Sequence, residues 1–200
     1  MGALTDWFWS STPPGGTEVA AREMHGLVAE TFTAVLRAWN NRDADAMRSH
    51  VSRSYLDTAR KALDALDRDF QVNRIEDVKL RNVAVQRPAD GRRYVPVDAY
   101  LAFVARIWLE DLRTGDVLSG DAEAPRAFTQ RWTFVFERRH GWVTDHAESI
   151  WTASAERMSA VEWPGLPAGW YSTRGRASSW RQWDGEAWID PAERPGNPRA

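Results

Sequence analysis

Apolar side chains follow a helical period in the first third of the chain. From residue 17 to residue 39 they recur every three or four positions, the spacing of one helix face. The same pattern predicts a short second helix over residues 43–50 and a third over residues 54–69. The positions of the third helix that we expect to share one apolar face are Tyr55, Ala59, Leu63, Leu66 and Phe70.

The apolar period changes to two beyond residue 75, which is typical of strands. Alternation predicts a first strand over residues 75–86. It then predicts a three-stranded antiparallel meander over residues 95–112, 128–138 and 142–151. Gly115 and Gly120 are expected in turns, and Gly141 in a tight hairpin with positive φ. Helices followed by an antiparallel sheet predict an α+β fold, a curved sheet with the helices on one face.

The chain divides into five segments on these patterns. They are a flexible aromatic N-terminal arm (1–16), an α+β domain (17–152), a linker (153–166), a small Trp-rich β module (167–190) and a disordered tail (191–200). In the arm, Trp7, Phe8 and Trp9 are candidates for contact with the lipid headgroup boundary, where Trp is favoured. The alternative is that these rings pack on the domain.

Composition excludes several classes of function. With 26 basic and 28 acidic residues, the net charge of −2 offers no field for nucleic acid. The absence of Cys excludes disulfides, a thiol nucleophile and cysteine-ligated metals. No signal peptide or membrane span is evident, so we expect a cytoplasmic protein. The 12 Trp are concentrated toward the C-terminus, with seven from Trp142 onward.

Three motifs carry a resemblance to a known family. They are ARIWLEDLRTGDVLSGD (105–121), FTQRWTFVFERR (128–139) and GWVTDHAESIW (141–151). They resemble the Tim44-like domain, which has the cone-shaped fold of nuclear transport factor 2, over about residues 20–152. The family is named for a peripheral scaffold of mitochondrial inner-membrane protein import. The resemblance implies binding to membranes or export machinery and no reaction. The long basic chaperone-binding region of the import subunit is missing, so that role is not implied.

The segment PAGWYSTRGRASSWRQWDGEAWID (167–190) resembles a small actinobacterial module of unknown function. It matches P-A-G-W-Y and W-D-G-x-x-W, but Ser172-Thr173-Arg174 replaces the Asp-Pro pair of the module. So small a unit must stack its Trp on one another or offer them to a partner. The candidate partner-binding residues are Trp170, Tyr171, Trp180, Trp183 and Trp188. Docking of this hairpin on the main domain is an equal alternative.

Enzymes of the wider cone fold place an acid, a His or a Tyr inside the cone, so Asp98, Tyr100 and His146 are the alternative catalytic candidates. Asp145 and His146 are adjacent in a strand, and their side chains are therefore expected on opposite faces rather than as one dyad. No metal-ligand spacing, phosphate loop or nucleophile elbow is present, so we expect no metal and no cofactor.

The favoured interpretation is a non-enzymatic interaction or scaffold protein, peripheral to the inner face of the cytoplasmic membrane. Its partner would be a protein, such as a membrane or secretion component, or anionic lipid, and not nucleic acid. The alternative is an enzyme or small-ligand carrier that uses the cone interior. An interior filled by Phe103, Trp132 and Phe134 would count against that alternative. A third interpretation is a glycan-binding Trp module. The open sheet face of this fold class often pairs two copies, so a homodimer is a further option.

Overall fold

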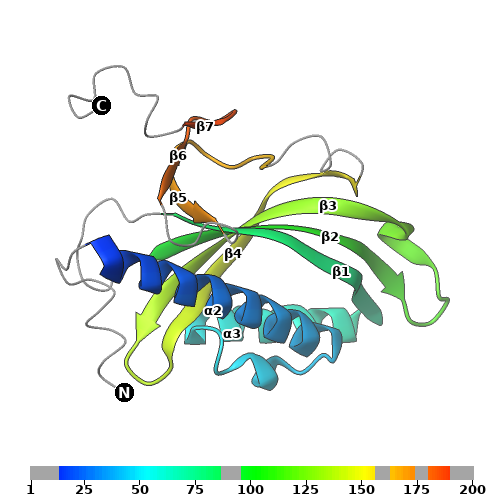
Figure 1. Ribbon diagram of the computed structural model, residues 1–200. Coiled ribbons are helices and arrows are strands. Elements are labelled where there is room, and N and C mark those ends of the chain that lie inside the picture. Colours follow the sequence, from blue (N-terminus) through cyan, green and yellow to red (C-terminus); the bar gives the residue numbers. More distant parts are fainter. Residues whose placement is uncertain (1–13, 87–95, 156–162, 174–179, 190–200) are drawn as a thin grey trace.

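The computed structural model describes residues 14–86, 96–155, 163–173 and 180–189. Helices α2 (Pro14–Asn40) and α3 (Arg53–Arg68), joined through the 3₁₀ helix η1 (Ala44–Met47), cover one face of an antiparallel sheet (Figure 1). The strands are β1 (Gln71–Gln86), β2 (Val97–Asp111), β3 (Val117–Glu137), β4 (Gly141–Ser154), β5 (Gly169–Thr173), β6 (Arg181–Trp183) and β7 (Trp188–Ile189). Their spatial order is β4-β3-β2-β1-β5-β6-β7, an open sheet. The predicted α+β class is confirmed.

Local capping explains where the short helices begin. The Asp43 side chain accepts the N–H of Ala46 at the start of η1, which is shorter than the predicted second helix. The Ser52 hydroxyl accepts the N–H of Tyr55 at the start of α3. Helix α3 ends at Arg68, and the prediction that Phe70 lies on its apolar face is wrong, because Phe70 has a φ of 55° and is exposed.

The strands confirm the predicted alternation but extend beyond it. Strand β3 begins 11 residues before the predicted Phe128, so most of the expected turn segment is strand. Gly120 lies opposite Trp108 within β3, and the prediction that it forms a turn is wrong. Its φ is 85°, and a Cβ there would meet the Ile107 carbonyl oxygen at 2.3 Å. Only glycine allows this close strand approach. Gly141 has a φ of 78° in the predicted β3–β4 hairpin.

The main core fills the space between the helices and the sheet. The Phe32 ring of α2 lies 5.0 Å from the ring of Phe103 and 5.5 Å from that of Trp132. Phe103, Trp132 and Phe134 are almost fully buried. Burial of each such side chain contributes about 1.5–3 kcal/mol, so this aromatic layer holds α2 on the sheet.

A second, smaller core lies on the opposite face of the sheet. It joins Ala84, Tyr100 and Ala102 of the sheet to Trp163, Leu166, Tyr171 and Trp183 of the C-terminal segment. Strand β5 pairs with β1 from Ala84 to Gln86, so the C-terminal strands continue the sheet (Figure 1). On the helix side, the His25 Nε2 and Ser172 Oγ atoms lie 3.2 Å apart. Strand β5 therefore contacts the rest of the protein on both faces.

Candidate functional site

Asp98 and His146, two of the three candidate catalytic residues, lie on the sheet face opposite the helices. The Thr133 hydroxyl donates to Asp98 at 2.6 Å, and the Arg131 guanidinium lies 4.0 Å from the same carboxylate. The other side of Arg131 forms an ion pair with Glu148. His146 is exposed, with its Nε2 3.7 Å from Glu148. These charges form a strip across β2, β3 and β4 outside the main core.

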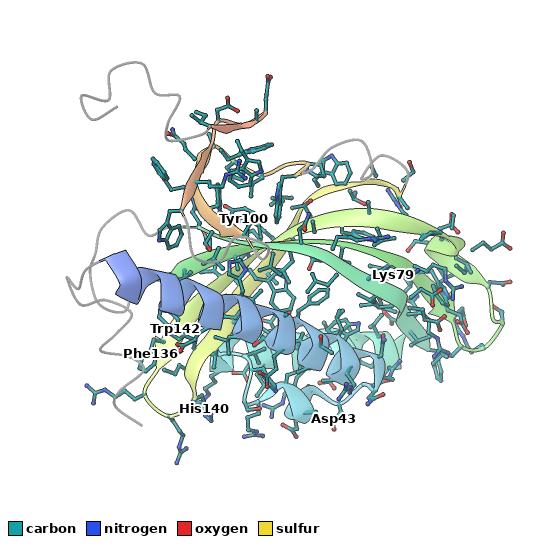
Figure 2. The ribbon with its side chains drawn as sticks, viewed as in Figure 1. Asp43, Lys79, Tyr100, Phe136, His140 and Trp142 are labelled. Atoms are coloured by element: carbon teal, nitrogen blue, oxygen red, sulfur yellow. The ribbon has the colours of Figure 1, made fainter. Side chains whose placement is uncertain are left out.

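Tyr100 borders this strip at the place where β5 meets the sheet (Figure 2). Its hydroxyl donates to Gln86 Oε1 at 3.3 Å, and its ring meets that of Tyr171 edge to face at 5.6 Å. Burial raises the pKa of Tyr100, so the phenol stays protonated at neutral pH. A buried phenol that donates to an amide is a packing group here. The structure thus gathers Asp98, Tyr100 and His146 on one face, but not in the cone interior.

Asp145 lies on the helix side of the sheet. Its carboxylate accepts hydrogen bonds from the hydroxyls of Ser52 and Ser54 at the start of α3. These two hydrogen bonds lower the pKa of Asp145. The prediction that Asp145 and His146 lie on opposite faces agrees with these contacts. The Asp145 carboxylate serves the fold by binding the start of α3.

The arginines of the outer face are matched by acids. Arg106 binds the carboxylates of Glu76 at 3.0 Å and Asp77 at 2.8 Å. Arg131 is held by Asp98 and Glu148 as described. Such partly exposed pairs contribute at most about 1 kcal/mol each. They leave no concentration of unmatched positive charge for phosphate groups on this strip.

The predicted partner-binding aromatics divide into two groups. Tyr171 and Trp183 are 0% and 3% exposed, and the Trp183 indole N–H donates to the Leu166 carbonyl at 3.0 Å. These two side chains belong to the second core, because the C-terminal strands need them to pack on the sheet. Trp170, Trp180 and Trp188 keep partial exposure. Binding of a partner by these three remains a prediction.

The Asp184-Gly185 turn between β6 and β7 confirms the predicted hairpin. The Asp184 carboxylate accepts the N–H groups of Glu186 and Ala187, and Gly185 takes a φ of 114°. Trp183 and Trp188 flank this turn with ring centroids 5.1 Å apart. Trp7, Phe8 and Trp9 of the arm lie outside the described residues.

An exposed apolar patch stands at the far end of the sheet from the C-terminal strands, where α3 meets β1 and where β2 turns into β3. Its members are Phe70, Leu112, Val117 and Leu118, each about half exposed. We call these four residues the distal patch. The spacing of α3 predicts Phe70 on its apolar face, and the turns predicted at Gly115 and Gly120 flank Val117 and Leu118. The available signal was the pair of adjacent apolar residues within TGDVLSGD.

Neither a metal-binding cluster nor a membrane-spanning helix is present in the part of the chain that the structure describes. That part contains no group of three or more His, Cys, Asp or Glu side chains that could hold a metal ion. None of its helices combines the length and the apolar character needed to cross a bilayer.

The family model of the Tim44-like domain matches residues 21–155, more than half of the chain. The chain belongs to the Tim44-like domain family. The match includes α3 and β1 to β4 together with most of α2, and it ends before β5. In this Tim44-like domain, the last three strands therefore extend the sheet beyond the matched region.

Two comparisons add context to the family match. A search of curated proteins found no relative of this chain. Among solved structures, the intermembrane space region of chloroplast protein ARC6 is similar at 16% identity with a TM-score of 0.49. The similarity covers 64% of this chain and 95% of that one.

Proposed function

We propose that this Tim44-like domain is a non-enzymatic interaction domain, peripheral to the inner face of the cytoplasmic membrane, which binds a protein partner. The observation that carries the proposal is the filled interior. Phe103, Trp132 and Phe134 occupy the space in which a cone-fold enzyme would hold its substrate. Binding must then use the surface of the domain.

Placement of the polar groups supports the same conclusion. The residues that an acid–base mechanism would use lie on the outer face, where Asp98 and Arg131 are engaged with each other and with neighbouring strands. Family membership supports an interaction role, since the domain takes its name from a scaffold of a membrane import machinery. A protein partner from a membrane or secretion complex is the partner class that fits both points.

The C-terminal strands bear on how a partner or a second copy would bind. The side chains of Trp163, Leu166, Tyr171 and Trp183 cover part of the outer sheet face. A homodimer through that face would have to form beside them. The partly exposed rings of Trp170, Trp180 and Trp188 add aromatic surface to the C-terminal segment, which suits a protein interface.

Co-sedimentation and affinity capture with the full chain test this proposal. Tagged protein is mixed with vesicles of phosphatidylcholine, with and without phosphatidylglycerol, and separately with a detergent-solubilised membrane fraction of the native host. We expect specific capture of a membrane-associated protein. The proposal fails if neither vesicles nor the membrane fraction yields a bound component above the level of an unrelated protein of equal charge.

Matched variants locate the contact. Replacing Trp7, Phe8 and Trp9 by Ala tests the arm in the vesicle assay. The double variant Trp170→Ala, Trp180→Ala tests the C-terminal surface in the capture assay without removing the buried Trp183. A turnover screen that detects activity sensitive to Asp98→Asn would instead support the enzyme alternative.

A further inference from the structure

The distal patch has no explanation within the fold, and what we infer from it rests on the proposed interaction role. Its four side chains are the exposed large apolar residues of the described chain. The Leu112 N–H donates to the Phe70 carbonyl at 2.7 Å, which fixes the α3–β1 junction beside the β2–β3 turn. Val117 pairs with Glu110 at the end of β2. The patch is therefore held together by backbone contacts.

Phe70 is unfavourable for the isolated protein in two ways. It follows the C-cap Asp69 of α3 with a φ of 55°, a left-handed conformation that costs a side-chain-bearing residue about 1 kcal/mol or more. Its ring is also 54% exposed, supported on one side by the Arg113 guanidinium at 5.3 Å. Gly would suit this position better for folding alone. The ring is thus best explained by a contact outside the fold.

The backbone beside the patch offers an open strand edge. Strand β4 pairs with β3 only from Arg126 onward, so the first part of β3 has β2 as its one strand neighbour among the described residues. Farther along, the Asp121 carboxylate caps the N–H groups of Glu123 and Ala124, and Pro125 has no N–H. Those devices close the edge to another strand. They do not reach the stretch from 117 to 120, which contains the apolar pair and a one-residue bulge at Leu118.

The exposed area of the distal patch and the charges at its rim indicate which kind of partner it binds. The four half-exposed side chains present on the order of 350 Å² of surface, well below the roughly 800 Å² per partner of a stable dimer. A second copy of the chain is therefore too large a partner for this patch alone. At the rim, Arg113 is paired with Asp111 at 2.8 Å and also interacts electrostatically with Asp69, while the exposed Asp116 forms no ion pair among the described residues. This unmatched carboxylate favours a cation and opposes anionic lipid.

We infer that the distal patch binds an extended segment of a partner protein, in which apolar residues alternate with Lys or Arg. The segment adds as a strand along residues 117–120 of β3 and places its apolar side chains on Phe70 and Val117. A basic residue of the segment meets Asp116. This binding mode uses main-chain hydrogen bonds for affinity and the four apolar side chains for selection.

Site-specific photocrosslinking in the full chain tests the inference. Leu118→p-benzoylphenylalanine is irradiated in an extract of the native host that includes its membranes, and the adducts are mapped by mass spectrometry. The control carries the same photoprobe at the exposed Lys79, elsewhere on the sheet. We expect adducts from position 118 alone, on a protein segment in which apolar and basic residues alternate.

Two variants separate binding from folding. Phe70→Gly relieves the left-handed strain, so its thermal midpoint should equal or exceed that of the wild type, while the adduct yield should fall at least tenfold. Asp116→Lys should lower the yield at least fivefold without unfolding, because the side chain is exposed. Asp77→Gly, another side-chain-bearing residue with positive φ, is the matched control and should keep the full yield.

The inference is overturned if position 118 crosslinks to lipid, to a second copy, to a segment without that alternation, or to nothing. It is overturned equally if the yield survives Phe70→Gly. These results differ from failure of the proposed function. If the wild type and Phe70→Gly capture the same membrane protein equally well, the interaction role stands and the distal patch is excluded as its site.

Discussion

Removal of Trp183 tests whether the C-terminal strands belong to the main fold. In Trp183→Ala, the indole ring is lost from the second core, where the residue is 3% exposed and its ring meets that of Trp188 edge to face. The hydrogen bond to the Leu166 carbonyl is lost with it. Truncation of a buried Trp to Ala typically costs about 3–5 kcal/mol of unfolding free energy. We expect a loss in that range for the whole domain, because β5 is paired with β1.

Urea unfolding followed by far-ultraviolet circular dichroism measures this loss. For a domain of this size, the expected change lowers the urea midpoint by roughly 1–2 M while the transition stays single. Trp180→Ala is the matched control, since its side chain is only partly buried and should cost about 1 kcal/mol. If both variants leave the main transition unmoved, or if a separate early transition appears, the C-terminal strands are an independent appendage and the reasoning fails.

Three further predictions concern stability. Ser52→Ala removes the N-cap of α3 and one hydrogen bond to Asp145, so thermal unfolding should show a loss of about 1 kcal/mol of unfolding free energy. An unchanged unfolding free energy would show that this cap does not stabilise the helix. Because its folded-state pKa is lowered, Asp145 stabilises the fold above its unfolded pKa of about 3.9 and loses this effect as pH falls through the lower value. Acid titration of wild type against Asp145→Asn should therefore show a full difference near pH 6 that vanishes in strong acid; a constant difference would contradict this. Gly120→Ala should destabilise the domain by more than 1 kcal/mol in urea, since its Cβ would meet the Ile107 carbonyl oxygen, and a neutral effect would show that β2 and β3 shift to make room for it.

The periodicity of apolar residues was enough to predict the main helices and strands, because each of these elements depends on the spacing of neighbouring residues. The apolar face of α2 and the alternation of β2 are properties of neighbouring residues, and both agree with the structure. The docking of β5 on β1 could not be predicted in this way. Its pairing with β1 joins Ala84 to Thr173, positions 89 residues apart, and no local pattern specifies such a contact. The sequence could therefore offer docking only as an equal alternative to a partner-binding groove.

The location of His146 shows how one extra residue in a strand changes the sheet face on which the following side chains lie. If Thr144 and His146 shared a face, His146 would lie beside the main core. In the structure Thr144 pairs with Phe134, whereas His146 pairs with the adjacent Thr133, so Asp145 is a bulge residue. A bulge of this kind shifts the alternation by one position. Thr144 is consequently buried while His146 is exposed on the outer face.

Phe70 was misassigned to the apolar face of α3 because the sequence does not mark the end of that helix. The apolar spacing continues from Leu63 through Leu66 to Phe70, and the sequence Asp67-Arg68-Asp69 contains no Gly or Pro that would mark a helix end. The helix ends because Phe70 itself adopts the left-handed conformation that Gly usually provides. A sequence shaped by folding alone would favour Gly there and a polar residue on the surface. The choice of Phe is therefore evidence about binding, and Phe70→Gly is the substitution that separates the two demands.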